Sequence, residues 1–323
     1  MALCGKDYKK DFYVNYGMVV SFYTANSYGN VPYLANQLNI LACKRNKTTA
    51  IIKNLITGES AQFDVSQLID NPGLYYLWKS ATVPNYARAA IAGQAICNGY
   101  FSTDEEDEKV LNWHKKQYPW LFPDQAWTVV GKTNEDTDRA TIANITGNGN
   151  NLALSNLGFI EGSGYNEEGK YAGYLVTDGV DDKIQSSNFS IGKDFTVVGE
   201  WKMLKNSDTY ELAGINKYDS FILYNYSYNN RINVYIHSGQ GTPINTDSIK
   251  AFTSTGLIYI DNFNNVEEVI PRDKTDRGYT LFMGYNNNVF TKLAFKNLAI
   301  YPTVLSKDDC IKAYNYLQTL KAK

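Results

Sequence analysis

The sequence predicts an α+β amino-terminal module followed by an all-β sandwich that ends in a packed helix. From about Asn134 onward, short apolar runs alternate with turn residues roughly every 8 to 12 positions, which is typical of a β-sandwich or barrel. The first third instead mixes strand-like runs with two helical patterns. A chain of 323 residues also exceeds the usual size of one domain. We therefore expect an anchoring or assembly module over residues 1–125, a junction over 126–142 and the sandwich over 143–323.

The amino-terminal module is expected to begin with strands, because residues 12–66 carry Tyr, Phe, Val and Ile between turn residues. A helix is predicted over residues 84–99, where a proline stands at the start and Asn-Gly at the end. A second helix follows Thr103, which has the spacing of a capping box with Glu106, and Pro119 ends this helix. These elements make the first third a small α+β unit.

A closing helix is predicted from Ser306 to the end of the chain. Ser306 and Asp309 have the spacing of a capping box. Behind them, apolar residues recur at helical spacing and form one stripe that can pack on the sandwich. This stripe consists of Cys310, Ala313, Tyr314, Leu317 and Leu320.

Composition and charge exclude several classes of partner. The formal net charge is −2, so the chain offers no basic field for nucleic acid or acidic lipid. Its four cysteines contain no C-x-x-C pair, so no zinc knuckle or disulfide framework is indicated. The start lacks the apolar region of a signal peptide, and no apolar run approaches the roughly 20 residues of a membrane helix. We expect synthesis in a cytoplasm without a signal peptide, no cofactor, and no binding to nucleic acid or membrane.

Four stretches, in this order along the chain, resemble the concanavalin A-like lectin and glucanase superfamily, in particular its laminin-G-like members. They cover just over half of the chain. They are ITGNGNNLALSNLGF (145–159), GYLVTDGVDDKI (173–184), DFTVVGEWKML (194–204) and LFMGYNNNVFTKLAFKNLAIYPTVLSKDD (281–309). The resemblance implies a jelly-roll sandwich for residues 143–323. In the third stretch, strand alternation predicts Phe195, Val197, Trp201 and Met203 on the core face, and Thr196, Val198, Glu200 and Lys202 on the other.

A second resemblance suggests where the protein acts. The stretch GKTNEDTDRATIANITGNGNNLALSNLGF (131–159), together with YLVTDGVDDKI, is similar to proteins of tailed phages, including crAss-like ones, and of prophages of gut Bacteroidales. This resemblance implies a virion structural protein, either a fibre-like tail component or a capsid decoration. Such a protein would associate with copies of itself, as a trimer, with other virion proteins and with host surface polysaccharide.

The acidic window LVTDGVDDKI (175–184) has two interpretations. Asp178-Gly179 is a dipeptide that a two-residue type I′ hairpin turn prefers, because both central residues need a positive φ. Alternatively, Asp178, Asp181 and Asp182 gather around Ca²⁺, although the dense alternating spacing of a calcium loop is absent. We favour the turn.

Catalytic motifs are scarce. Retaining glucanases of the resembled fold carry an E-x-D-x-E strand, and this sequence has no such run. Glycoside hydrolysis needs two carboxyl groups about 5 to 10 Å apart. The best strand candidates, Glu200 and Glu211, have no acidic partner two or four residues later. We therefore expect a non-enzymatic protein. A polysaccharide-active enzyme of the glycoside hydrolase type and a bacterial surface lectin are the alternatives.

A tyrosine-rich hairpin is the best candidate for binding. If Asn229-Asn230 is a two-residue turn, Tyr228 pairs with Arg231, Tyr226 with Asn233, and Tyr224 with Tyr235. One face of the hairpin, the tyrosine face, then holds Tyr224, Tyr226, Tyr228, Arg231, Asn233, Tyr235 and His237. Aromatic rings stack on sugars, while amides and guanidinium groups bind hydroxyls. A glycan platform, a subunit interface and an ordinary solvated sheet all remain open for this face.

Overall fold

The computed structural model describes residues 2–5, 12–15, 19–23, 28–32, 39–45, 49–64, 76–77, 104–204, 209–215, 221–226, 231–236, 242–244, 249–260, 262–268, 277–283, 285–286, 289–290 and 292–322. The chain divides into two compact units, residues 1–117 and 118–323. Within the described ranges, no helix combines the length and the apolar character that a membrane crossing requires.

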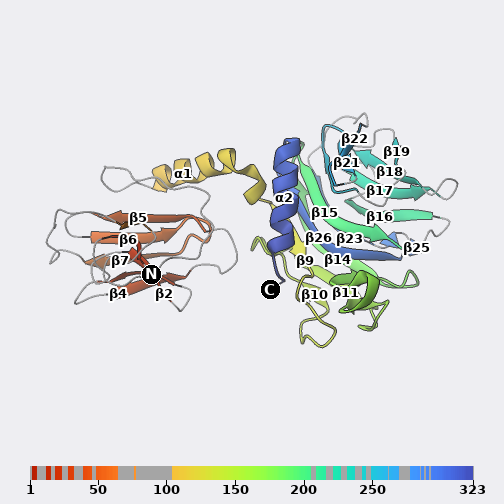
Figure 1. Cartoon of the computed structure of the whole chain (residues 1–323), viewed down its shortest axis with the longest axis horizontal. Coiled ribbons are helices and arrows are strands. Elements are labelled where there is room, and N and C mark those ends of the chain that lie inside the picture. The colour runs from red at the N-terminus through yellow and green to blue at the C-terminus, as the bar shows by residue number, and fades with distance from the viewer. Residues whose placement is uncertain are drawn as a thin grey trace. The chain divides into compact units, whose positions relative to one another are not determined.

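The described residues of the first unit form two antiparallel sheets and helix α1 (Figure 1). Its five-stranded sheet has the order β4-β3-β2-β1-β8, and its three-stranded sheet has the order β5-β6-β7. The strands are β1 (Ala2–Gly5), β2 (Phe12–Asn15), β3 (Val19–Tyr23), β4 (Tyr28–Pro32), β5 (Leu41–Arg45), β6 (Thr49–Asn54), β7 (Ser60–Asp64) and β8 (Tyr76–Leu77). Helix α1 spans Asp104–Gln117, with four acids in its first turn. Strands and a second helix therefore occur where they were predicted, whereas the helix predicted over 84–99 lies outside the described residues.

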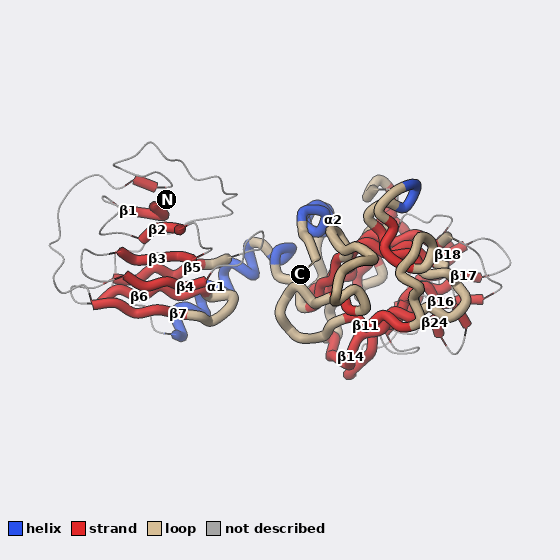
Figure 2. Tube along the Cα trace, turned by 90° about the horizontal axis from the view of Figure 1, so that it is seen from below, coloured by secondary structure: helices blue, strands red, loops and turns tan. Residues whose placement is uncertain are grey.

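The second unit is a β-sandwich of two eight-stranded sheets (Figure 2). The first sheet has the order β10 (Thr141–Ile142), β11 (Leu152–Ser155), β14 (Lys183–Ile191), β23 (Arg277–Met283), β16 (Thr209–Ile215), β17 (Phe221–Tyr226), β18 (Arg231–Ile236) and β19 (Thr242–Ile244). The second sheet has the order β12 (Gly164–Asn166), β13 (Tyr174–Val176), β26 (Leu293–Tyr301), β15 (Thr196–Met203), β20 (Ala251–Thr253), β21 (Leu257–Ile260) and β22 (Asn265–Glu268), and β9 (Gln125–Thr128) also pairs with β26. Short elements complete the unit: η1 (Pro119–Leu121), η2 (Gly169–Tyr171), β24 (Tyr285–Asn286) and β25 (Val289–Phe290).

The core lies between the two sheets. Phe195, Val197 and Trp201 of the β15 segment point inward, as the alternation predicted, and Val198 lies on the opposite side of its sheet. From the first sheet, Ile184 and Phe189 of β14 join the same core. Because burying one such side chain contributes about 1.5 to 3 kcal/mol, this shared core holds the sheets together.

Helix α2 (Lys307–Thr319) covers the outer face of the second sheet (Figure 1). Ser306 caps it, because its side chain accepts a hydrogen bond of 3.1 Å from the backbone N–H of Asp309. The predicted stripe is confirmed, since Cys310, Ala313 and Leu317 are buried against Val198 and other residues of the sheet. The carboxyl-terminal part of the chain is therefore a sandwich with one packed helix, and the jelly-roll assignment stays a prediction.

Residues 126–142, which were expected to form a junction, belong to the sandwich. Strand β9 pairs with β26, and β10 pairs with β11. Trp127 is fully buried in the core, and its indole N–H donates to the carbonyl oxygen of Asn150 at 2.7 Å. The sequence indicated a junction because aromatic and proline residues crowd residues 118–127, whereas the pairing partner of β9 lies about 170 residues later.

Candidate functional site

The tyrosine face lies on the paired strands β17 and β18, but in a different register from the predicted one. Tyr226 pairs with Arg231, Tyr224 with Asn233, and Ile222 with Tyr235. The predicted two-residue turn is therefore wrong, since four residues, 227–230, separate the paired strand ends. Because the register differs by two positions and strand residues alternate with a period of two, the described residues of the predicted set still share one face.

The backbone register also indicates which face of the first sheet these residues occupy. Buried Met283 pairs with Ala213, Ala213 pairs with Leu223, and Leu223 pairs with Val234. Directly paired residues lie on one side of a sheet, so this row belongs to the core side. The positions of Tyr224, Tyr226, Arg231, Asn233 and Tyr235 are consequently on the other, outward side. Tyr228 and His237 lie outside the described residues, so their predicted membership of the tyrosine face stays a prediction.

The acidic window is a turn, but it is not a hairpin. Strand β13 belongs to the second sheet and β14 belongs to the first, so residues 177–182 carry the chain from one sheet to the other. The type I′ prediction is also wrong, because only Gly179, with φ +77°, has a positive φ in this turn. A Cβ atom at Gly179 would lie 2.9 Å from the backbone nitrogen of Lys292, which explains the glycine.

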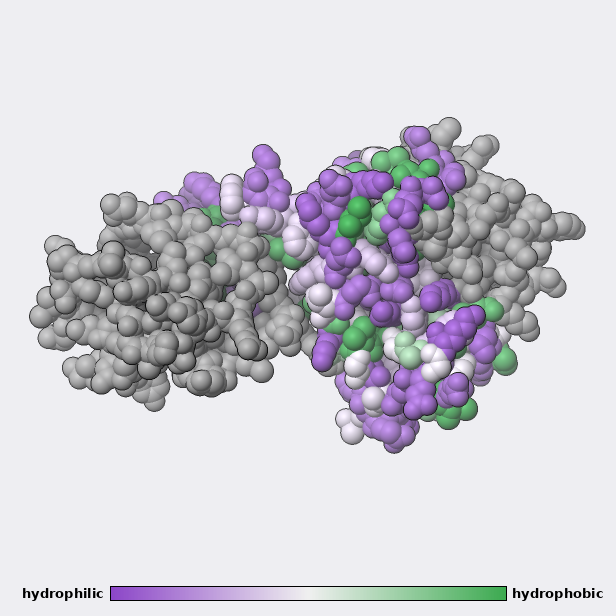
Figure 3. Space-filling view, viewed as in Figure 1, coloured by the Kyte–Doolittle hydropathy of each residue, from purple (hydrophilic) through white to green (hydrophobic). Residues whose placement is uncertain are grey.

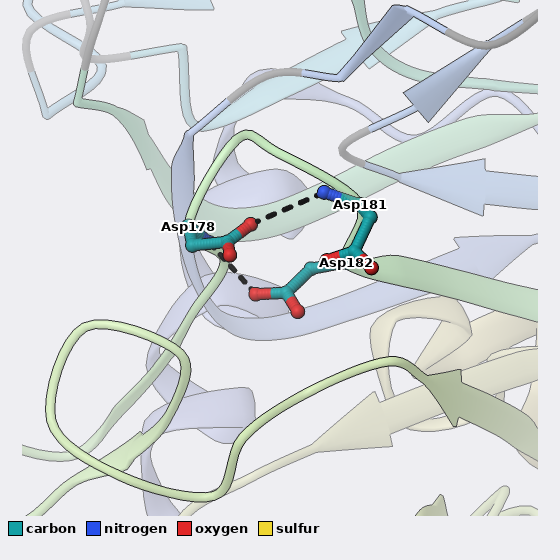
Figure 4. A group of neighbouring side chains, drawn as sticks. All are labelled: Asp178, Asp181 and Asp182. Carbon is teal, nitrogen blue, oxygen red and sulfur yellow. Dashed lines mark hydrogen bonds between the residues drawn. The ribbon is translucent and has the colours of Figure 1, made fainter.

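Two of the three aspartates of this turn, Asp178 and Asp182, accept hydrogen bonds from its backbone (Figure 4). One oxygen of Asp178 accepts hydrogen bonds from the backbone N–H groups of Val180 (2.7 Å) and Asp181 (3.4 Å). Asp182 in turn accepts from the backbone N–H of Asp178 (2.7 Å) and from the hydroxyl of Ser163 (2.9 Å). These bonds give the acids a structural role, which supports the turn interpretation.

The calcium alternative stays a prediction. Carboxylate oxygens of Asp178, Asp181 and Asp182 lie within 4.8 Å of one another. Burial raises the pKa of Asp182, because it disfavours the charged form, and the neighbouring aspartates add to this increase. Three carboxylates are fewer than the six to eight oxygen ligands that Ca²⁺ usually takes.

A second polar group forms on the outer face of the second sheet, beside α2. Its centre is Glu200 on β15, where the pairing of β15 with β26 is irregular between Glu200 and Trp201. Gly199 precedes it, and a Cβ atom there would lie 2.6 Å from both the carbonyl oxygen of Asn297 and the Trp201 ring. The close approach of β26 at this point brings Lys296 to the same face as Glu200, with Nζ 3.6 Å from a carboxylate oxygen.

Two tyrosine hydroxyls bind the carboxylate of Glu200. Tyr174 of β13 donates to one oxygen, and Tyr314 of α2 donates to the other at 3.0 Å. The carboxylate therefore ties β13, which lies on the far side of β26, and the covering helix to one point of β15. Only 13% of the Glu200 side chain is exposed, so these bonds are made largely away from water.

Three lysines surround these tyrosines. The ammonium group of Lys202 lies 5.0 Å from the centre of the Tyr174 ring, and that of Lys296 lies 5.6 Å from it. The ammonium group of Lys250 lies 5.1 Å from the centre of the Tyr314 ring. Such distances allow cation–π attraction. We call Glu200, Tyr174, Tyr314, Lys202, Lys250 and Lys296 the Glu200 cluster.

The ionisable groups of the cluster perturb one another. Burial by itself raises the pKa of Glu200, but the Tyr174 hydrogen bond, Lys250 and Lys296, and the Tyr314 hydrogen bond outweigh it, so the pKa is lowered. Burial lowers the pKa of Lys250, and the positive charges of Lys202 and Lys296 oppose its protonation further, while Glu200 favours it. Burial and the Glu200 charge raise the pKa of both tyrosines. At neutral pH the hydroxyls therefore stay protonated as donors to a charged carboxylate.

Sequence reasoning found Glu200 and Lys202 on an outward face but missed the rest of the cluster. Its members come from five separate segments, around positions 174, 200, 250, 296 and 314, so no local sequence motif predicts the cluster. The signal in the sequence was a charged pair, two residues apart, on a strand whose other face is apolar. Glu211, the other strand carboxylate considered, pairs with Tyr224 on the tyrosine-face side of the first sheet.

Comparisons with known proteins give distant structural similarity. No family model matches the sequence, and no curated protein matches it significantly. The structure is similar to the botulinum neurotoxin serotype D ligand binding domain in complex with N-acetylneuraminic acid, with a TM-score of 0.44 and 14% identity over 60% of this chain and 50% of that chain. It is also similar to Trypanosoma rangeli sialidase, with a TM-score of 0.41 and 9% identity over 67% of this chain and 38% of that chain. The chain thus spans about half the length of the toxin domain, and scores this low do not define its function.

Proposed function

We propose that this chain is a non-enzymatic structural protein of a tailed-phage virion whose sandwich binds host surface polysaccharide through the tyrosine face. The observation that carries the binding proposal is the register of β17 and β18. It places the positions of three tyrosines, Arg231 and Asn233 together on the outward side of a sheet. Tyrosine supplies a rigid apolar ring with a polar end, which suits contact with sugar rings and their hydroxyls.

The virion part of the proposal comes from the phage-like sequence of residues 131–159 and 174–184. We place the chain in a fibre-like, tail or capsid-decoration component, assembled as a trimer with other virion proteins. Mass measurement of the purified chain in solution tests the trimer. Mass spectrometry of purified particles tests the location, and absence of the chain from particles would contradict it.

The environment of Glu200 supports a protein that binds rather than hydrolyses. A glycoside hydrolase needs a second carboxyl group about 5 to 10 Å away. The charged groups that act on Glu200 are instead lysines, and both of its oxygens accept tyrosine hydrogen bonds. Release of reducing sugar from host capsule polysaccharide by the purified chain would contradict the non-enzymatic proposal.

A binding experiment on the intact chain tests the tyrosine face. The chain is applied to an array of host capsule and surface polysaccharides, beside the Tyr224→Ala and Tyr224→Phe variants. We expect Tyr224→Ala to weaken binding about ten-fold, because it removes a ring of the kind that dominates contact energies, and Tyr224→Phe to retain most of it. Lys193→Ala, at an exposed position, is the control. Unchanged binding by Tyr224→Ala would contradict the proposal.

A further inference from the structure

We propose that the Glu200 cluster is a second binding site, and that it takes the carboxylate and a neighbouring hydroxyl of an acidic sugar. This site is separate from the tyrosine face, because it lies on the outer face of the other sheet, beside α2. The proposal does not depend on the phage assignment or on binding at the tyrosine face.

The charges of the cluster do not balance. Lys250 and Lys296 act on the carboxylate of Glu200, and the ammonium group of Lys202 lies over the Tyr174 ring, so three positive charges of the cluster accompany one negative charge and two are in excess. The three ammonium groups lie close enough that Lys202 and Lys296 both act on Lys250. A bound anion would offset this mutual repulsion, and lysine is a common donor to carboxylates.

Burial strengthens the requirement for an anion. Lys250 is only 8% exposed, and the cost of removing a cation from water is recovered only when an opposite charge or several acceptors are near. Its nearest carboxylate partner in the cluster, Glu200, already accepts two tyrosine hydrogen bonds and faces Lys296. An incoming carboxylate would therefore meet a cation that the cluster does not fully neutralise.

An unpartnered amide beside Glu200 is the second observation. Asn297 pairs directly with Glu200 across β26 and β15, its side chain is fully buried, and both its amide nitrogen and its oxygen lack a hydrogen-bond partner. On α2, one turn after Tyr314, the amide nitrogen of Gln318 is likewise buried without a partner. Buried amides nearly always have hydrogen-bond partners. The unpartnered amide groups of Asn297 and Gln318 therefore supply donors and an acceptor for a polar ligand at this site.

The combination of groups points to an acidic sugar in particular. Lysines suit a carboxylate, whereas Glu200 and the amide of Asn297 suit the hydroxyls that an acidic sugar carries beside its carboxylate. The described surface around α2 is mostly hydrophilic, in keeping with a guest that arrives from water (Figure 3). A neutral sugar would leave the two excess charges unmatched, so the site should discriminate on charge.

Calorimetric titration of the full chain tests the site with two ligands that differ in one group. One ligand is an oligogalacturonate, and the other is the same oligosaccharide with its carboxyl groups methyl-esterified. We expect saturable binding of the acid and at least about ten-fold weaker binding of the ester, because charge-assisted hydrogen bonds are lost. Raising the salt concentration should weaken binding of the acid, since ions screen partly exposed charges.

Charge-removing variants locate the binding. Lys202→Gln and Lys296→Gln should each weaken oligogalacturonate binding about ten-fold, whereas Lys193→Gln, an exposed lysine after β14, should not change it. Unchanged thermal unfolding of the variants shows that they remain folded. Because neither Lys202 nor Lys296 belongs to the tyrosine face, loss of binding in these two variants separates the site from that face.

Three results would overturn the proposal. They are the absence of saturable oligogalacturonate binding, equal affinities for the acid and the ester, and equal losses in Lys193→Gln and Lys296→Gln. Inorganic phosphate is titrated in parallel, and if it binds as tightly as the oligogalacturonate, the cluster holds an adventitious ion only. A failure of this kind would leave neutral-polysaccharide binding at the tyrosine face untouched.

Discussion

The carboxylate of Glu200 is held in its charged form although burial opposes that form. Hydrogen bonds from Tyr174 and Tyr314, together with Lys250 and Lys296, lower its pKa below the ordinary value of 4.5. A carboxyl group whose folded pKa is lowered stabilises the folded state above its unfolded pKa. That contribution disappears as the pH falls through the folded pKa. Glu200 should therefore contribute to the loss of stability at acid pH.

Replacing Glu200 with glutamine tests this linkage. We expect Glu200→Gln to lower the free energy of unfolding by about 1 to 2 kcal/mol at pH 7, because two hydrogen bonds to a charged group are weakened. The difference from the wild type should begin to shrink near pH 4.5, where the unfolded carboxyl group becomes protonated, and should disappear once the pH has fallen through the lower folded pKa. Urea unfolding at several pH values measures it, and exposed Glu161→Gln serves as the control. A difference that stays constant down to pH 3 would contradict this account.

Among the elements, helix α2 shows the clearest agreement between local sequence and structure. The Ser306 side chain accepts from the Asp309 backbone N–H, as the capping-box spacing predicted, and its hydroxyl also donates to the Asp309 carboxylate at 2.8 Å. The buried side of the helix then follows from helical periodicity. Helical periodicity could not predict which surface α2 covers, because the strands beneath the helix come from distant parts of the chain.

Loss of the cap should destabilise the second unit without changing its fold. We expect Ser306→Ala to lower the free energy of unfolding by about 1 kcal/mol, since it leaves helix N–H groups without an acceptor. Ser306→Asp should restore most of the loss, because aspartate caps helices as well as serine does. Chemical denaturation followed by circular dichroism measures both variants. Equal losses in the two variants would contradict a capping role.

At the scale of the whole molecule, stability of the sandwich depends on side chains shared by its two sheets. Phe195 is fully buried in the core between them. We expect Phe195→Ala to cost about 3 to 5 kcal/mol, the usual cost of removing a buried aromatic ring. Val180→Ala, at a side chain that is 70% exposed, should change stability by less than about 0.5 kcal/mol. A loss below 1 kcal/mol in Phe195→Ala, measured by urea unfolding, would contradict the shared core.

The tyrosine face and the Glu200 cluster differ in how far sequence could predict them. The members of the tyrosine face are close in sequence, so period-two alternation placed them together even though the pairing was displaced by two residues. The turn at Asp178-Gly179 was recognised from its residues, but its role as a crossing between sheets was not, because turn chemistry does not specify which strands pair. The Glu200 cluster could not be predicted from the sequence. Its residues meet only because of the registers of β13, β15 and β26 and the position of α2.

The sequence by itself determined the local properties of this protein. These are which segments form strands, which face of the β15 segment is apolar, and where α2 begins. Such properties depend on alternation, helical periodicity and capping, all of which act over a few residues. Only the tertiary structure decided that β13 and β14 lie in different sheets, and that Tyr174, Glu200, Lys250, Lys296 and Tyr314 meet. Those contacts depend on the pairing of distant strands, where burial of the shared core, rather than any local preference, selects the partner.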